Sequence, residues 1–193
     1  MKIAIYGGSF DYFHKGHFEI IKRLSKDYDI VLVIPTTIRY YKKNTQMFSF
    51  NERFETVVEK TKKLPNVKVL DIERNVDSDW RFINSLLKIK EIYGDNDYYV
   101  AMGSDSFQNF ESWCSYETIL NEVKNLVVFR RPGYEKDFPN VKHIYIEDMD
   151  MNISSTALRA KLKETIEEID LDEMIDDLSF CKGYEDFLDN YNY

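Results

Sequence analysis

Short apolar runs that alternate with amphipathic helices constrain the fold of this chain more than any other feature. Segments 2–6 and 29–34 are β-branched and apolar at successive positions, which is typical of strands covered on both faces. Between them, Phe18, Ile21 and Leu24 recur at three-residue spacing and predict a helix with one apolar face. Two strands joined by a crossover helix form a βαβ unit with parallel strands and a right-handed connection.

The same alternation continues through the middle of the chain. We expect helices at about 50–63, 79–92 and 116–123, and strands at 67–72, 98–102, 126–129 and 141–146. Five or six strands with helices between them predict a doubly wound parallel α/β sheet, which binds ligands at the carboxyl ends of its strands. The loops to search for a site are therefore those after Tyr6, Ile34, Met102 and Ile146.

The bulk composition predicts one domain. The chain has 193 residues, of which 44% are hydrophobic, and no Pro/Gly/Ser-rich linker divides it. Its longest purely apolar stretch, 30–34, is far shorter than the roughly 20 residues of a membrane helix, so we expect a cytoplasmic protein without a membrane partner. The two cysteines, Cys114 and Cys181, lie far apart and suggest neither a disulfide framework nor a zinc site.

The net charge of −8 is unevenly distributed. Residues 164–193 hold eleven Asp or Glu against one lysine, whereas residues 1–163 hold 25 basic and 23 acidic side chains and carry +2. The part before the tail can therefore accept a polyphosphate, but no basic stripe indicates a nucleic-acid partner. We interpret 1–163 as the α/β domain and 164–193 as a small helical C-terminal extension, which docks on the sheet or serves a homo-oligomer contact.

The loop after the first strand has features of a phosphate site. Two glycines stand at the strand exit, and His14 and His17 stand just before the helix. Glycines allow the backbone to approach a phosphate, and the free N–H groups at a helix start favour an anion. If both histidines lie in the first helical turn they share one face, where a hydrogen-bonded or protonated imidazole can stabilise charge on a phosphate.

A second segment, Ile153–Arg159, follows the last expected strand and opens a helix. Ser154 or Ser155 is a natural N-cap. Arg159 lies about one turn into that helix, where its guanidinium could hold outer phosphates together with the Ser and Thr hydroxyls, including that of Thr156.

The two segments together resemble the motifs of the adenylyltransferases in the nucleotidyltransferase superfamily. They read GSFDYFHKGH at 8–17 and ISSTALR at 153–159, about 140 residues apart and in the family's order. The resemblance covers about residues 1–163, with Tyr12 where proline is usual. It implies a Rossmann-like fold, catalytic roles for His14, His17 and Arg159, and ATP phosphate contacts at Gly8, Ser9, Phe10, Lys43, Ser154, Ser155 and Thr156.

The middle of the chain is similar to the pyridine-mononucleotide enzymes of that superfamily. Residues 102–107, MGSDSF, resemble their loop after a strand, which implies that Gly103 and Asp105 bind the adenosine ribose region. Residues 110–113, FESW, resemble the stretch whose tryptophan packs on the pyridine ring, here Trp113. Lys42 or Lys43 is expected near the phosphates, and Arg131 near the acceptor phosphate.

One departure concerns the pyridine substituent. Nicotinate-type enzymes usually carry a G-x-S-Y-T run that receives the carboxylate, whereas this chain has Asp79 and Trp80. Trp80 is closer to the pattern of enzymes that accept the amide or both forms, and Asp79 would disfavour a carboxylate if it points inward. The choice between acid and amide stays open, with the acid favoured by length and motif layout.

The implied reaction is an in-line attack of the mononucleotide phosphate on the α-phosphorus of ATP, which releases pyrophosphate. No carboxylate cluster would cage a metal, so we expect Mg²⁺ to be held mainly by ATP and water. Two alternatives remain. One is a related nucleotidyltransferase with another acceptor, such as phosphopantetheine or a phospho-alcohol, and the other is a non-catalytic nucleotide-binding module.

Overall fold

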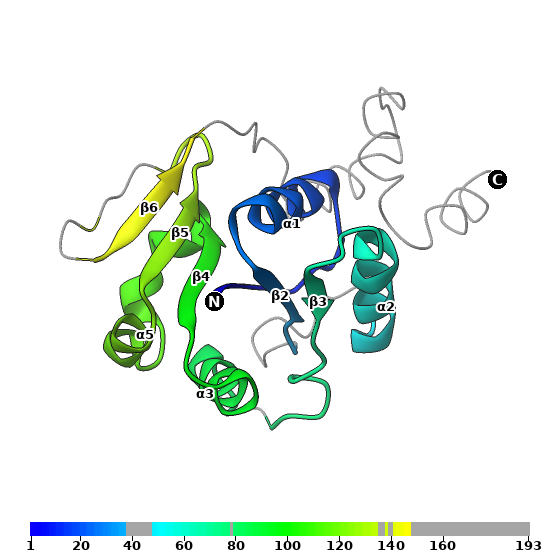
Figure 1. The fold of residues 1–193 in the computed structure, drawn as a ribbon, viewed down its shortest axis with the longest axis horizontal. Helices are drawn as coiled ribbons and strands as arrows, with labels where there is room; N and C mark the ends of the chain where they lie inside the picture. Colours follow the sequence, from blue (N-terminus) through cyan, green and yellow to red (C-terminus); the bar gives the residue numbers. More distant parts are fainter. Residues whose placement is uncertain (38–47, 78, 135–137, 139–140, 148–193) are drawn as a thin grey trace, which may run out of the picture.

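The computed structural model describes residues 1–37, 48–77, 79–134, 138 and 141–147. Its strands are β1 (Lys2–Gly8), β2 (Ile30–Pro35), β3 (Val67–Val69), β4 (Asp97–Gly103), β5 (Asn125–Phe129) and β6 (His143–Ile146). Its helices are α1 (Lys15–Asp27), α2 (Phe50–Thr61), α3 (Phe82–Tyr93), α4 (Ser104–Phe107) and α5 (Tyr116–Glu122), with a 3₁₀ turn, η2, at Phe110–Ser112. Figure 1 shows their arrangement around the sheet.

The six strands form one sheet in the order β3-β2-β1-β4-β5-β6, and every neighbouring pair is parallel. The predicted doubly wound α/β fold is therefore confirmed. From β1 the chain moves outward through β2 and β3, then returns to the other side of β1 at β4. The crevice at this reversal is the place where sheets of this kind bind ligands.

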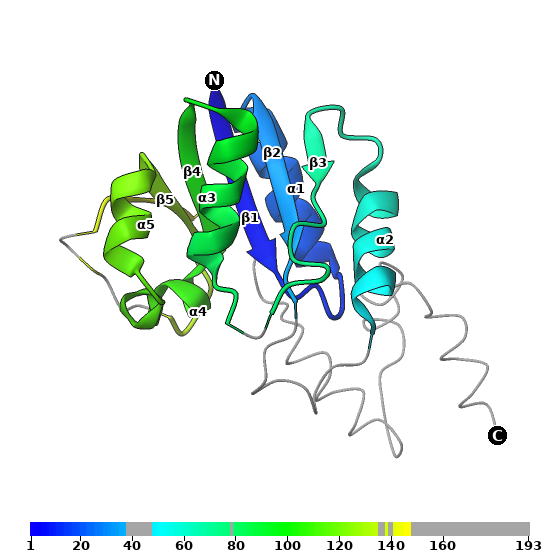
Figure 2. The same cartoon turned by 90° about the horizontal axis from the view of Figure 1, so that it is seen from below.

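Each face of the sheet carries its own apolar core. Successive strand side chains point to opposite faces, so Ile3 and Ile5 of β1 join one cluster, whereas Ala4 and Tyr6 join the other. Buried side chains of α1 and α2 join the second cluster and those of α3 and α5 the first, and Figure 2 shows α3 in front of the sheet with α1 behind it. This layering leaves the carboxyl ends of β1, β4 and β5 at a shared edge.

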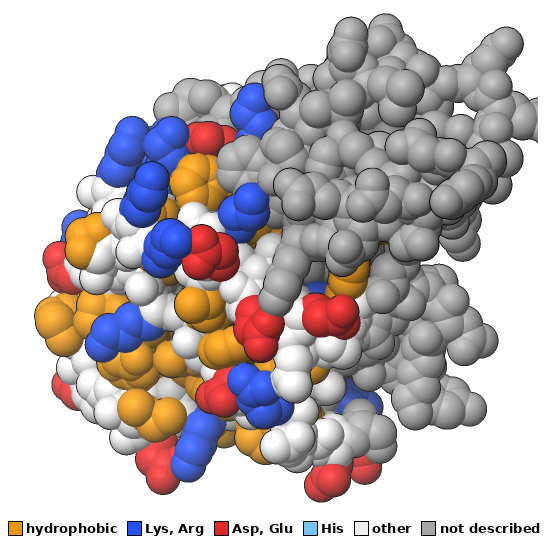
Figure 3. Space-filling view, turned by 90° about the vertical axis from the view of Figure 1, so that its right-hand side faces the viewer, with side chains coloured by type: hydrophobic (Ala, Val, Ile, Leu, Met, Phe, Trp, Pro, Cys, Tyr) orange, Lys and Arg blue, Asp and Glu red, His pale blue; other side chains and the backbone are white. Residues whose placement is uncertain are grey.

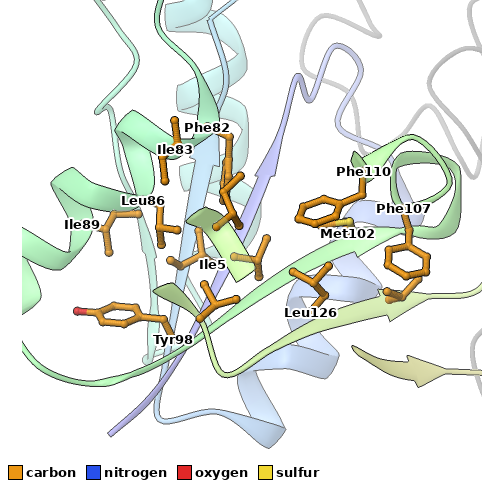
Figure 4. Close-up of a cluster of buried hydrophobic side chains, with 14 of the residues drawn as sticks. Ile5, Phe82, Ile83, Leu86, Ile89, Tyr98, Met102, Phe107, Phe110 and Leu126 are labelled. Atoms are coloured by element: carbon orange, nitrogen blue, oxygen red, sulfur yellow. The ribbon is translucent and has the colours of Figure 1, made fainter. Parts of the chain in front are cut away.

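The larger core lies beneath α3 and α4 (Figure 4). From α3 it receives four buried side chains at helical spacing, namely Phe82, Ile83, Leu86 and Ile89. Burial of side chains of this size contributes roughly 1.5–3 kcal/mol each. The resulting attachment holds the N-terminus of α3 at the edge where the strands end.

Several predicted boundaries were wrong. The helix expected at 79–92 begins at Phe82, because the Trp80 N–H donates to the Asp77 carbonyl at 3.0 Å and Arg81, with extended backbone angles, is the N-cap. The strands expected at 67–72 and 141–146 are shorter, ending at Val69 and beginning at His143. The one-turn α4 and η2 were not predicted, since elements this short show no readable periodicity.

Several predicted site residues lie outside the described residues: Lys42, Lys43, Ser154, Ser155, Thr156 and Arg159. The extension predicted at 164–193 lies outside them as well. Within the described ranges, no helix is long and apolar enough to span a membrane. On the side that lies to the right in Figure 1, acidic and basic side chains are interspersed over the described surface (Figure 3).

Candidate active site

His14 and His17 form the start of α1. His14 is the N-cap, with extended backbone angles, and His17 is the third helical residue. Each backbone N–H is 3.4 Å from the other ring's Nδ1, which makes a reciprocal capping box. The two rings stack with centroids 3.7 Å apart and planes inclined by 19°. The predicted shared face is therefore present, and the histidine rings themselves satisfy the helix start.

These hydrogen bonds define the protonation of the two rings. A ring nitrogen that accepts a hydrogen bond carries no proton, so both neutral rings hold their proton on Nε2. A hydrogen bond with the Tyr12 backbone acts on His17, whereas the buried His14 Nε2 has no partner among the described residues. His14 therefore has an N–H donor available to a ligand.

Burial keeps both rings neutral. Desolvation and, secondarily, the charge of Arg131 lower the pKa of His14 to about 3. Desolvation also holds the pKa of His17 well below its usual value, with smaller contributions from His14 and Arg131. Of the two states that sequence analysis allowed, the neutral hydrogen-bonding imidazole is the one present in this structure.

Phe10 packs against the histidine pair. Its side chain is buried, and its ring makes an edge contact with His17 at 5.1 Å between centroids. Its backbone lies in the left-handed region at φ 48°. A phosphate can therefore meet only the backbone of Phe10. Gly8 is close-packed against the same ring, because a Cβ at Gly8 would lie 3.0 Å from Phe10.

Asp105 and Arg131 meet at the exits of β4 and β5. One guanidinium nitrogen of Arg131 lies 3.5 Å from Asp105 Oδ2, and the Arg131 backbone N–H donates to Ser104 Oγ at 2.9 Å. Gly103 permits this arrangement, since a Cβ there would lie 2.3 Å from Asp105 Oδ1. Arg131 Nε is buried and, within the described ranges, has no hydrogen-bond partner.

The ends of three strands converge at this place. Burial raises the pKa of Tyr6 on β1, while the Arg131 charge lowers it and the Asp105 charge raises it to lesser extents. Arg131 also acts on both histidines, although more than 110 residues of sequence separate them. The structure thus brings together His14, His17, Gly103, Asp105 and Arg131. An available N–H donor near a guanidinium is suited to an anion that gains charge during a reaction.

Trp113 lies at the rim of the larger core. It is partly buried, with Phe82 at 5.5 Å and Phe110 at 5.4 Å between ring centroids. Two further rings therefore pack against Trp113, whose contact with an acceptor ring stays a prediction. Trp80 lies before α3 and donates from Nε1 to Ser85 Oγ at 2.8 Å.

Sequence reasoning missed a buried polar network next to this site. Arg53 of α2 is 2% exposed and donates through Nη1 to the carbonyl of Thr36, at 2.9 Å, and to that of Ser9. Glu73, which is 3% exposed, accepts from the Thr37 N–H at 3.0 Å. One signal was available, because Arg53 stands four residues before Val57 on the apolar face of its helix.

Known proteins share both the sequence and the fold. The cytidylyltransferase-like family matches residues 5–161. A probable nicotinate-nucleotide adenylyltransferase of Fusobacterium nucleatum is 38% identical over 172 residues, which cover 84% of this chain and 88% of the relative. One of Aliarcobacter butzleri is 30% identical over 164 residues, with the same shares.

A solved structure supports the fold alone. The nicotinic acid mononucleotide adenylyltransferase of Plasmodium falciparum, complexed with NaAD, aligns with a TM-score of 0.75 over 99% of this chain and 96% of its own, at 21% identity. The family assignment rests on the sequence matches. The chain is a nucleotidyltransferase of the cytidylyltransferase-like family and belongs to its nicotinate-nucleotide adenylyltransferases.

Proposed function

We propose that this protein transfers the AMP part of ATP to nicotinate mononucleotide, giving the dinucleotide and pyrophosphate in NAD biosynthesis. The observation that carries the proposal is the neutral, buried His14, whose Nε2 has no partner among the described residues at the exit of β1. Relatives with this family name cover most of the chain and support the choice of acceptor.

In the proposed reaction, an oxygen of the mononucleotide phosphate forms a bond to the α-phosphorus of ATP. The bond from that phosphorus to the bridging oxygen breaks, and both electrons leave with pyrophosphate. Because the attacking oxygen is already anionic, no base is needed, and catalysis consists of positioning and charge stabilisation. We propose that His14 donates its Nε2–H to an α-phosphoryl oxygen as that oxygen gains charge.

Arg131 and Asp105 would each position one of the two substrates. Nε of Arg131 has no partner in the described part of the chain and can donate to the acceptor phosphate. The Asp105 side chain is 38% exposed beside the pair, so its carboxylate can still accept from a ribose hydroxyl of ATP. Trp113 would pack its face on the pyridine ring.

The remaining proposed contacts lie outside the described residues. Arg159 with Ser154, Ser155 and Thr156 would hold the outer phosphates of ATP, and Lys42 or Lys43 would reach them from the segment after β2.

His17 would support His14 through the capping box. We further propose that the enzyme works in the cytoplasm.

Magnesium is proposed as the accompanying ion. In the described ranges no three His, Cys, Asp or Glu side chains gather to hold a metal. We propose that the ion is held mainly by the ATP phosphates and water. When bound there it would neutralise phosphate charge. The roles of His14 and Arg131 derived above hold whether or not a protein group also touches the ion.

A pyrophosphate-release assay tests the function. ATP with nicotinate mononucleotide should release pyrophosphate and form the dinucleotide, with a higher kcat/KM than nicotinamide mononucleotide. Phosphopantetheine with ATP and nicotinate mononucleotide with CTP are the comparison pairs. If pyrophosphate were released only with ATP and phosphopantetheine, phosphopantetheine would be the acceptor and the proposal would be wrong. No release with any pair would favour a nucleotide-binding module without catalysis.

A further inference from the structure

Ser85 connects the Trp80 indole to a buried carboxylate. Its hydroxyl accepts from Trp80 Nε1 at 2.8 Å and donates to Glu73 Oε1 at 2.6 Å. Ser85 is fully buried and Glu73 is 3% exposed. A hydroxyl has one proton to donate, so the bond to Glu73 leaves the Ser85 oxygen oriented as an acceptor for the indole. The chain of hydrogen bonds thus fixes the edge of Trp80 that bears Nε1.

The other oxygen of Glu73 ties this chain to the loop after β2. Oε2 accepts from the Thr37 backbone N–H at 3.0 Å. Arg53 lies nearby, and the charges of Asp11 and Glu73 raise its pKa against the larger lowering by burial. Since Arg53 also donates to the Thr36 and Ser9 carbonyls, one buried network holds the loops after β1 and β2 and the segment before α3.

We propose that Ser85 and Glu73 are positioning residues that set the orientation of Trp80 for the pyridine mononucleotide. This inference rests on the proposed function, in which Trp113 packs on the pyridine ring, and on the sequence position of Trp80, where nicotinate-type enzymes usually carry the run that receives the pyridine carboxylate. Trp80 stands two residues before Phe82, whose ring contacts Trp113. A rotation of the Trp80 side chain would therefore change the segment just before α3, next to the surface of Trp113 on which the pyridine ring would lie.

A double-mutant cycle tests the bond between Ser85 and Trp80. Ser85→Ala removes the acceptor, and Trp80→Phe removes the donor while it keeps an aromatic ring. We expect each variant to raise the KM for the mononucleotide roughly ten-fold, with kcat and the KM for ATP little changed. The double variant should be no worse than the worse single variant, because both substitutions remove the same hydrogen bond.

A matched control separates positioning from stability. Thr61→Val removes another buried hydroxyl, which donates to the Val57 carbonyl at 2.8 Å at the opposite end of α2 from the strand exits. It should lower Tm without a change in either KM. If Ser85→Ala behaves like Thr61→Val, or if the effects of the two single variants add, the proposal is overturned.

A spectroscopic measurement keeps this inference distinct from the proposed function. The chain has two tryptophans, so Trp113→Phe leaves Trp80 as the sole tryptophan, whose indole can be excited selectively over the 14 tyrosines. In that background, Ser85→Ala should increase acrylamide quenching of Trp80, because the indole loses its anchor. Unchanged quenching would show that Ser85 does not orient Trp80, even if the enzyme is active. Absence of dinucleotide formation by the unmodified protein would contradict the function while this measurement still reports on the anchor.

Discussion

The imidazole of His14 stacks on that of His17 with 3.7 Å between ring centroids, and each ring caps the backbone of the other residue. The pair therefore has two roles that can be separated. It satisfies N–H groups at the start of α1, and it leaves His14 Nε2 for a ligand. The capping role can be supplied by other side chains, whereas the donor at this position cannot.

We predict that His14→Asn folds but loses activity. Asparagine is a favourable N-cap, so α1 should be retained. The loss of one donor to the reacting phosphate should lower kcat by about 10²–10³-fold. Steady-state kinetics would measure this change, with His143→Gln on β6 as the control that removes an imidazole elsewhere. Near-normal turnover in His14→Asn or in His17→Ala would remove that histidine from the proposed mechanism.

We predict that the histidine pair makes the protein less stable in acid. Burial lowers the pKa of His14 from 6.5 to about 3, so between these values the unfolded chain binds more protons than the folded one. The free energy of unfolding therefore rises with pH in this window, by at most roughly 1.4 kcal/mol per pH unit for each such histidine, and levels off above the unfolded pKa.

Urea unfolding at pH values from 4 to 8 measures this dependence. The carboxylates contribute a slope of the same sign, so the informative quantity is the difference between the unmodified protein and His14→Asn. That difference should vary with pH below 6.5 and be constant above it. A difference that is constant throughout would show that His14 has the same pKa in both states.

We predict that Gly103→Ala weakens ATP binding more than folding. The new Cβ would lie 2.3 Å from Asp105 Oδ1, so the carboxylate must move, although the backbone need not. The KM for ATP should rise while Tm changes little. Because the effect acts through Asp105, adding Gly103→Ala to Asp105→Ala should cause no further rise in KM. A further rise would place the defect in the backbone.

We predict that Trp113→Leu raises the KM for nicotinate mononucleotide, whereas Trp113→Phe has a smaller effect. An aromatic pair contributes roughly 0.5–1.5 kcal/mol beyond burial, which corresponds to a change of several-fold. The KM for ATP serves as the internal control, since ATP does not contact this ring in the proposed arrangement. Equal changes in both KM values would indicate a general packing defect.

We predict that Arg53→Met destabilises the fold strongly. The substitution leaves the carbonyls of Ser9 and Thr36 without their buried donor. A buried acceptor left unsatisfied typically costs about 1–3 kcal/mol, so the loss of the donor to both carbonyls should cost several kcal/mol. Lys88→Met is the control, because Lys88 pairs with Glu91 on the surface and should contribute at most about 1 kcal/mol. Chemical denaturation would measure the free energy of unfolding of both variants. Similar losses of stability would show that the buried hydrogen bonds of Arg53 contribute no more than a surface ion pair.

The sequence by itself was sufficient to predict the doubly wound sheet, and it indicated the strand ends as the place to look for a site. Buried strands and amphipathic helices have periods that are readable over 5 to 15 residues, and glycines with histidines at a strand exit point to phosphate chemistry. Ends of elements were less predictable, as at α3, because a cap or turn depends on single hydrogen bonds. The roles of Lys43 and Arg159 stay predictions.

Only the tertiary structure decided the charge of the site and the contacts that support it. The charge of Arg131 acts on the histidines because β5 lies beside β4, which lies beside β1, and no local pattern encodes that order. The neutrality of His14 follows from burial by residues distant in sequence. Glu73, Ser85 and Arg53 come from the segment after β3, from α3 and from α2. Glu73 and Ser85 look like ordinary surface residues until the fold brings them together, and Arg53 differs only by its place on the apolar face of its helix. Local periodicity thus determined the scaffold, and long-range contacts determined the chemistry that the scaffold can support.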